Sequence, residues 1–217
     1  DYSLNHRDGK ALFLKDAKYF YRKRSDGTST LDNSWTTPQK FKDVLEYGYI
    51  PFLKDSKDAL GFVPYHTQRT ILYDVVWYVK HLMNQSGKAA FLSQNQKEVF
   101  FSLLKEIFTY IDSKTILEFD LGAWFLHKVA LLGCLKGEAP PFQIVYIENV
   151  DKEKKQLLLS YFTYNLVNEE IQINNQDIIP SYTKSTCNTF VDQHLVYERR
   201  LWIPYDDTEQ LLKVFIN

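Results

Sequence analysis

The apolar residues of this chain change their spacing at one point, the proline pair Pro140–Pro141. Before that pair they recur every three to four positions over long stretches, which is the pattern of a helix with one buried face. After it, apolar and polar residues alternate in short runs between polar turn sequences, as in antiparallel strands. The sequence therefore predicts an α+β fold: an N-terminal extended segment, a helical bundle and then a small antiparallel β-sandwich.

Residues 37–138 are predicted to form the helical domain. The first helix is expected to begin at Thr37, which is a favourable N-cap, and Pro38 suits the first helical position. Gly48 is expected to end this helix, because glycine is the usual residue just after a helix C-terminus.

Three more helices are predicted within residues 67–83, 95–111 and 121–137. The last of them is apolar nearly all round, which predicts the central helix of the bundle, and Lys136–Gly137 is a typical helix end. The residues expected to face inward on the other two are Leu72, Val75, Val76, Val79, Leu82, Phe100, Leu103, Leu104, Ile107, Phe108 and Ile111.

Residues 139–217 are predicted to form the β domain, and residues 1–36 an extended segment. In the extended segment, residues 11–24 show a broken alternation that a Ser-Asp-Gly turn sequence closes. The β-domain strands are expected within residues 142–150, 156–164, 169–173, 194–205 and 210–217, with polar turns at 151–155, 174–177 and 206–209.

Composition excludes several classes of protein. The formal net charge is −1, so no global attraction to nucleic acid or acidic membranes is indicated. No apolar run is long enough for a membrane span, and no signal peptide is visible. Cys134 and Cys187 are too few for a zinc framework, and both are predicted to be reduced and buried. Aromatic residues make up 16% of the chain, which favours surfaces that stack on sugars or bases.

Motifs that would mark a complete enzyme are absent from the sequence. There is no glycine-rich phosphate loop, no HExxH, no close Cys/His cluster and no GxSxG. Catalytic residues therefore remain unassigned, and no metal ligands are predicted. Because residue 1 is not methionine, we expect the chain to be a fragment of a longer protein.

Two groups in the first half of the chain could bind a ligand. Arg22 and Arg24 lie two apart on the expected strand, so two guanidinium groups on one face could clamp an anion; a solvated strand end is the alternative. The second group is in the stretch "PYHTQRTILYD", where His66 and Arg69 could bind a sugar. There the alternative is that these side chains, with Gln68, Tyr73 and Asp74, cap or brace the helix.

Two groups in the second half complete the candidates. His127–Lys128 lies inside the apolar helix pattern, and a core histidine with a hydrogen-bond partner is the favoured interpretation. Glu198, Arg200 and Trp202 alternate along a predicted strand and so share one face. That face is either a sugar platform or a structural tryptophan beside a cross-strand ion pair.

Four stretches carry a resemblance to a known family: "YFYRKRSDGTSTLDNSW", "FKDVLEYGYIPFL", "GFVPYHTQRTILYDVVWYVKHL" and "LVYERRLWIPY". They resemble the region that follows the catalytic core in bacterial family-2 glycosyltransferases, enzymes that build capsule, teichoic acid or other surface polysaccharides. In that family a nucleotide-binding GT-A domain with a DxD-type metal motif comes first. This sequence has no DxD after an apolar strand. The pair Asp206–Asp207 does not replace that motif, because it is in a predicted turn.

The resemblance implies a C-terminal accessory region that holds the acceptor or assembles the enzyme and lacks the catalytic residues. Residues 1–36 would then include a remnant of the catalytic domain, with Arg22, Arg24, Asp26 and Ser29 at the edge of its active site. Nucleotide sugar and divalent metal would bind elsewhere in the full-length enzyme.

The implied partners are the chain's own catalytic domain, a polysaccharide acceptor and a second copy of the chain, with neither nucleic acid nor a membrane span. The implied location is the cytoplasm, with the inner face of the membrane as an open alternative. Two other functions remain open: an independent carbohydrate-binding module, which predicts an exposed Trp202, and a structural or oligomerisation module.

Overall fold

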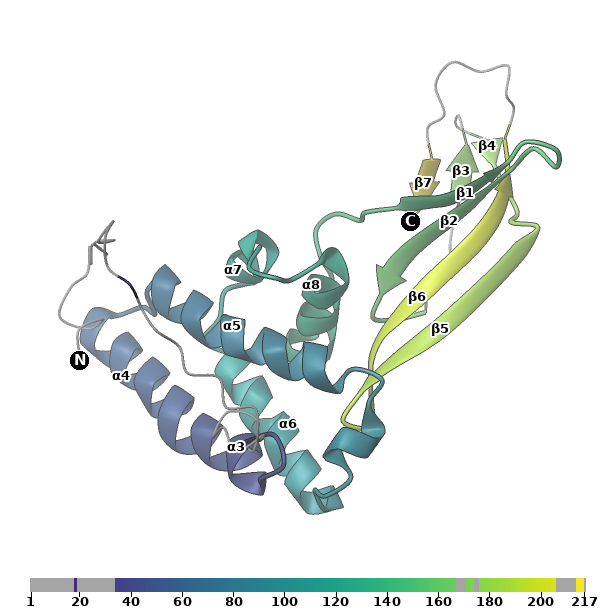
Figure 1. Ribbon diagram of the computed structural model, residues 1–217. Coiled ribbons are helices and arrows are strands. Elements are labelled where there is room, and N and C mark those ends of the chain that lie inside the picture. The colour runs from purple at the N-terminus through teal and green to yellow at the C-terminus, as the bar shows by residue number, and fades with distance from the viewer. Residues whose placement is uncertain (1–17, 19–33, 167–170, 174–175, 206–213, 217) are drawn as a thin grey trace. The chain divides into compact units, whose positions relative to one another are not determined.

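The computed structural model describes residues 18, 34–166, 171–173, 176–205 and 214–216 (Figure 1). The predicted extended segment, residues 1–36, lies almost wholly outside the described residues, and so does the predicted turn at 206–209. The chain forms two compact units. Unit 1 comprises residues 1–78 and 85–118, and unit 2 comprises residues 79–84 and 119–217. Helices followed by antiparallel sheets confirm the α+β class.

The described part of unit 1 is helical. Trp35, Phe41, Tyr78 and Phe100 form the aromatic centre of its core. The rings of Phe41 and Tyr78 meet edge to face with centroids 5.7 Å apart, and Phe41 meets Phe100 in the same way at 5.3 Å. The elements of the unit are α3 (Pro38–Asp43), η1 (Val44–Tyr49), α4 (Ile50–Leu60), α5 (Tyr65–Leu82), η2 (Ser86–Ala89), α6 (Gln94–Phe108) and α7 (Ser113–Glu118). Helix α5 belongs to unit 1 only up to Tyr78, and its last turn belongs to unit 2.

The first helix of the sequence starts where expected but does not end where expected. Thr37 has the extended backbone of an N-cap, and Pro38 occupies the first turn. Gly48, however, lies within the π-helical segment η1, and helical structure continues to Gly61, whose φ of 79° ends α4. The predicted end at Gly48 is therefore wrong. The wider π turns lead into Pro51, which has no N–H to donate and whose ring disfavours a regular α turn.

The predicted inward faces of the next two helices are confirmed. All of the predicted residues on these helices are buried except Leu103, which is half-buried. Tyr78 is also fully buried, and its hydroxyl donates to the carbonyl of Lys40 at 2.7 Å. Burial raises the pKa of Tyr78 far above its usual value, so this hydroxyl remains a donor at neutral pH.

Unit 2 combines a short helix with two antiparallel sheets. The strand orders are β1-β2-β6-β5 and β4-β3-β7. Ile171 of β3 belongs to the same apolar cluster as Leu157 and Leu159 of β2 and Leu201 of β6, so the two sheets share a core, as in a small sandwich. The elements are α8 (Phe125–Leu131), η3 (Leu132–Lys136), β1 (Tyr146–Asp151), β2 (Gln156–Thr163), β3 (Ile171–Ile173), β4 (Gln176–Asp177), β5 (Tyr182–Phe190), β6 (Gln193–Pro204) and β7 (Val214–Ile216).

Two features of unit 2 differ from expectation. The apolar segment 121–137 contains α8 and η3, which pack against the sheet rather than forming the centre of a helical bundle: α8 contacts β2 and β6, and η3 contacts β6. Strand β5 has no counterpart among the predicted strands. Residues 182–187 of β5 are all exposed, so neither face of the strand carries an apolar row. The predicted helix end at Gly137 is confirmed by its φ of 68°.

Gly133 in η3 is required by a close approach of Tyr164. A side-chain Cβ at this position would overlap the Cβ and Cγ of Tyr164, so only glycine leaves room for that tyrosine. Gly48 is in the opposite situation. It is helical, and apart from its chain neighbours and the backbone of its own helix no heavy atom lies within 4 Å of where its Cβ would be.

The two glycines predict opposite effects of the same substitution. Gly133→Ala should lower the free energy of unfolding by about 1–3 kcal/mol, because Tyr164 must move. Gly48→Ala should raise it by about 0.5–1 kcal/mol, because alanine loses less backbone entropy on folding. Urea unfolding followed by circular dichroism measures the free energy of unfolding of both variants. Equal stability of the two variants would contradict the difference between the surroundings of Gly133 and Gly48.

Candidate functional site

Four of the predicted binding residues, Arg22, Arg24, Asp26 and Ser29, lie outside the described residues. Their predicted role therefore stays a prediction. The other three, His66, Arg69 and Trp202, lie within the described residues.

Gln68 is a buried structural link at the start of α5. Its amide nitrogen donates to the carbonyl of Val63 at 2.9 Å and to the carboxylate of Asp112 at 2.8 Å. Its amide oxygen accepts from the backbone N–H of Asp112 at 2.7 Å and from the hydroxyl of Thr115 at 2.9 Å. With 3% exposure, this side chain joins α5 to α7 and uses both ends of its amide. Gln68 therefore braces the helix, which was the alternative to ligand binding for this group of residues.

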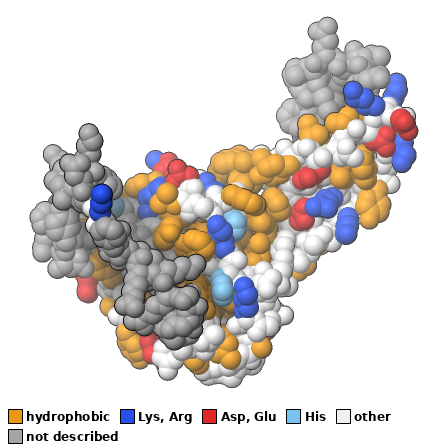
Figure 2. Space-filling view, viewed as in Figure 1, with side chains coloured by type: hydrophobic (Ala, Val, Ile, Leu, Met, Phe, Trp, Pro, Cys, Tyr) orange, Lys and Arg blue, Asp and Glu red, His pale blue; other side chains and the backbone are white. Residues whose placement is uncertain are grey.

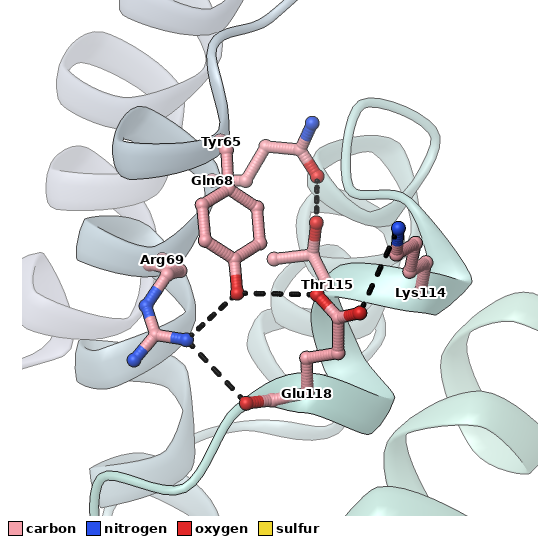
Figure 3. A network of polar contacts seen from close by, with 6 residues as sticks. All are labelled: Tyr65, Gln68, Arg69, Lys114, Thr115 and Glu118. Atoms are coloured by element: carbon pink, nitrogen blue, oxygen red, sulfur yellow. Dashed lines mark hydrogen bonds and ion pairs between the residues drawn. The ribbon is translucent and has the colours of Figure 1, made fainter.

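Arg69 lies one residue further along α5 and belongs to a surface network. Its Nη1 donates to the hydroxyl of Tyr65 at 2.9 Å and to the carbonyl of Glu118 at 3.4 Å. The guanidinium carbon lies 5.3 Å from the centre of the Tyr65 ring. Tyr65 in turn donates to Glu118, which pairs with Lys114 at 3.7 Å. Figure 3 shows these side chains converging from α5 and α7.

Arg69 also belongs to an exposed row on α5. Residues four apart on a helix are neighbours, so Tyr65, Arg69, Tyr73 and Trp77 form one inclined row that turns about 120° around the helix, called here the α5 stripe. The three rings are 48%, 46% and 45% exposed, in chain order. Tyr73 and Trp77 meet edge to face with centroids 6.3 Å apart. At the helical rise, the stripe is about 18 Å long, which exceeds a single sugar ring and suits an extended ligand.

Two neighbours of the stripe differ in their surroundings. His66 is exposed, and its backbone carbonyl accepts from the hydroxyl of Thr70 at 2.9 Å. Asp74 accepts from the hydroxyl of Tyr49 at 2.8 Å, and burial raises the pKa of Tyr49 well above its usual value. Asp74 is therefore tied into the packing of η1 against α5.

Trp202 lies on the face of β6 predicted from alternation. Glu198, Arg200 and Trp202 alternate along the strand, opposite Phe162, Ser160 and Leu158 of β2. Arg200 pairs with Glu198 at 2.8 Å within the strand rather than across strands. Trp202 is half-buried between its cross-strand neighbours Leu158 and Tyr182, so it is neither the fully exposed ring of a sugar platform nor a core residue. Figure 2 shows basic and acidic side chains close together on the visible face of this sheet.

His127 is a core histidine with a partner, as predicted. It is 4% exposed, and its Nδ1 accepts from the backbone N–H of Trp124 at 3.0 Å, which caps α8. Burial, and secondarily the charge of Lys80, lowers the pKa of His127 below its usual value. The ring is therefore neutral at pH 7, with its proton on Nε2.

The two cysteines are both free thiols, as predicted, but only Cys134 is buried. Cys187 is exposed on β5, so the prediction that both are buried is wrong. Its Sγ lies 3.3 Å from Nδ1 of His194.

No group of three or more His, Cys, Asp or Glu side chains in the described residues is arranged to hold a metal ion. Among the helices that the structure describes, none combines the length and apolar character needed to cross a membrane.

Two proteins of Bacillus subtilis (strain 168) are similar to this chain. The minor teichoic acid biosynthesis protein GgaA is 27% identical over 141 residues, which cover 65% of this chain and 30% of GgaA. The minor teichoic acid biosynthesis protein GgaB is 29% identical over 109 residues, which cover 48% of this chain and 11% of GgaB. No family model matches the chain, and no solved structure does. The chain thus spans less than a third of either relative, and their names agree with the surface-polysaccharide part of the resemblance.

The Gln68 network predicts a large loss of stability in Gln68→Leu. The substitution removes four hydrogen bonds, two of them buried bonds to the Val63 carbonyl and the Thr115 hydroxyl, which should cost at least about 2 kcal/mol. The matched control is Gln94→Leu at the exposed start of α6, which should change stability by less than about 0.5 kcal/mol. Chemical denaturation compares the two, and a neutral Gln68→Leu would refute the structural role.

The neutral state of His127 predicts acid sensitivity. The folded-state pKa is lowered, so on acidification the unfolded chain takes up the proton first. The free energy of unfolding should therefore be unaffected by this group above about pH 7, fall as the pH drops through about 6.5, and level off below the folded-state pKa.

In His127→Gln the amide oxygen can still accept from Trp124, and it does not titrate. Urea unfolding at a series of pH values should show a weaker fall below neutral pH in this variant than in the wild-type chain. An unchanged pH profile would argue against a neutral His127.

Proposed function

We propose that this chain is an accessory region of a bacterial glycosyltransferase of surface-polysaccharide biosynthesis, and that its α5 stripe holds the acceptor polymer. The observation that carries the proposal is the stripe itself: three half-exposed rings and a guanidinium group in one row on one helix. The similarity to two minor teichoic acid biosynthesis proteins supports the class of polymer.

The stripe has the chemistry that an anionic glycan requires. Flat faces of Tyr73 and Trp77 can stack on sugar rings, and the two side chains are already in contact, so little rotamer freedom is lost on binding. Arg69 supplies a cation that suits phosphate groups, which a teichoic acid carries along its chain. The contacts with Tyr65 and Glu118 hold that guanidinium in place before a ligand arrives.

Catalysis belongs, in this proposal, to a GT-A domain elsewhere in the full-length enzyme, where nucleotide sugar and divalent metal would bind. Holding a polymer on a separate surface raises the local concentration of its end near the catalytic domain. A cytoplasmic location beside the membrane, where such polymers are assembled, is part of the same proposal.

The direct test is binding of purified teichoic acid to the full 217-residue chain, measured by calorimetry, with neutral dextran for comparison. The double variant Tyr73→Ala/Trp77→Ala should bind teichoic acid at least about tenfold more weakly, which corresponds to about 1.4 kcal/mol. Arg69→Gln should bind more weakly and with a smaller dependence on salt concentration, because one phosphate contact is lost.

The matched control is Tyr47→Ala, because Tyr47 is 69% exposed on η1 and lies outside the stripe. Its affinity for teichoic acid should equal that of the wild-type chain. The proposal fails if the wild-type chain does not bind teichoic acid, or if the stripe variants and Tyr47→Ala lose affinity equally. A concentration-dependent solution mass without polymer binding would instead support an oligomerisation module.

A further inference from the structure

Unit 2 contains a pocket of about 500 Å³ that the α5 stripe does not explain. One wall is the connection after η3, from Gly137 to Gln143, and the other is the end of β2 and the residues after it, from Phe162 to Asn165. Val129 of α8 also lines the pocket. A volume of this size falls within the range of small-molecule sites in proteins.

The walls of the pocket are held in place by contacts that do not need a ligand. Pro140 and Pro141 restrict the backbone of the first wall. The amide nitrogen of Gln143 donates to the carbonyl of Phe162 at 2.9 Å, and this bond joins the two walls. Tyr164 packs its side chain against Gly133, which leaves no space for a Cβ. The pocket is therefore pre-formed, which lowers the entropic cost of binding.

Aromatic surface lines the pocket. Phe142 is 52% exposed, and its inner side stacks on Phe125 with centroids 5.5 Å apart and planes 22° apart. Phe162 is half-buried and contacts Tyr146 edge to face at 6.0 Å. Rings fixed in this way offer flat apolar surface, the kind of surface on which the C–H face of a sugar ring packs.

The polar groups of the pocket are neutral or acidic. Thr163 donates its hydroxyl to the carbonyl of Asn165 at 2.8 Å and keeps its oxygen as an acceptor. The side-chain amide of Asn165 is exposed and offers both donors and an acceptor. Glu138 provides a carboxylate, which pairs with Lys136 at 3.6 Å. Among the described lining residues none is Lys or Arg and Glu138 carries a negative charge, so a phosphate or carboxylate ligand is disfavoured there.

We propose that this pocket binds a neutral sugar ring, with Phe142 as the stacking surface and Asn165 and Glu138 as hydroxyl partners. The inference goes beyond the proposed function, because it needs no residue of the α5 stripe and no phosphate group. It assigns unit 2 a saccharide site of its own, with a preference for an uncharged sugar where the stripe prefers an anionic glycan.

The test uses the full chain and saturation-transfer NMR with methyl glycosides of glucose, galactose, N-acetylglucosamine and N-acetylgalactosamine, and with inorganic phosphate as the anionic probe. At least one glycoside should bind saturably below about 50 mM, and phosphate should not compete with it. Asn165→Ala and Phe142→Ala should each weaken that binding by at least about fivefold.

Phe62→Ala is the matched control, since Phe62 is 55% exposed in unit 1, and Trp77→Ala tests independence from the stripe. Both should bind the glycoside as the wild-type chain does. The proposal is overturned if no glycoside binds, if phosphate competes, if Asn165→Ala binds normally, or if Trp77→Ala reduces binding as strongly as Asn165→Ala. Asn165→Ala removes only exposed side-chain atoms, so its result stands even if Phe142→Ala does not fold.

Discussion

The arrangement of unit 1 depends on one buried amide, that of Gln68. A buried amide group is costly unless both of its ends are paired, and here all four of its hydrogen bonds lead to the segment before α5 or to α7 and the residue preceding it. This fixes the first turn of α5 against α7. Tyr65, Arg69 and Glu118 can form their surface network only because the two helices meet in this way. The exposed candidate site thus follows from a polar contact in the interior.

The sequence predicted the elements whose faces differ in polarity. The buried sides of α5 and α6, and the alternation of β2 and β6, leave a periodic signal because one face packs and the other meets water. Strand β5 leaves no such signal, because both of its faces are exposed over most of its length. Gly48 carried a misleading signal, since a glycine inside a π turn and a glycine after a helix look alike in sequence.

The candidate site was predictable only in part, for a similar reason. Arg69 was identified together with Tyr73, one helical turn away, and Trp77 could have been found from the same spacing of four, which links it to Tyr73. The contact with Glu118 could not have been predicted, because Glu118 is 49 positions from Arg69 and only tertiary packing brings them together. The pocket of unit 2 was equally hidden, since its walls are a proline-rich connection and a strand end that carry no motif.

Strand β5 has a consequence for how this protein behaves among many copies of itself. It lies at one edge of the four-stranded sheet, and among the described residues its outer row of backbone groups has no neighbouring strand apart from a bridge between Met83 and Phe190. Another chain can pair with such an edge as an additional strand, and this pairing is most favourable where the edge is apolar. The run of hydroxyl side chains and Lys184 along β5 makes that addition unfavourable, because charged and hydrated groups would have to be covered. The polar side chains that leave this strand without an alternating sequence pattern therefore also disfavour aggregation through its edge.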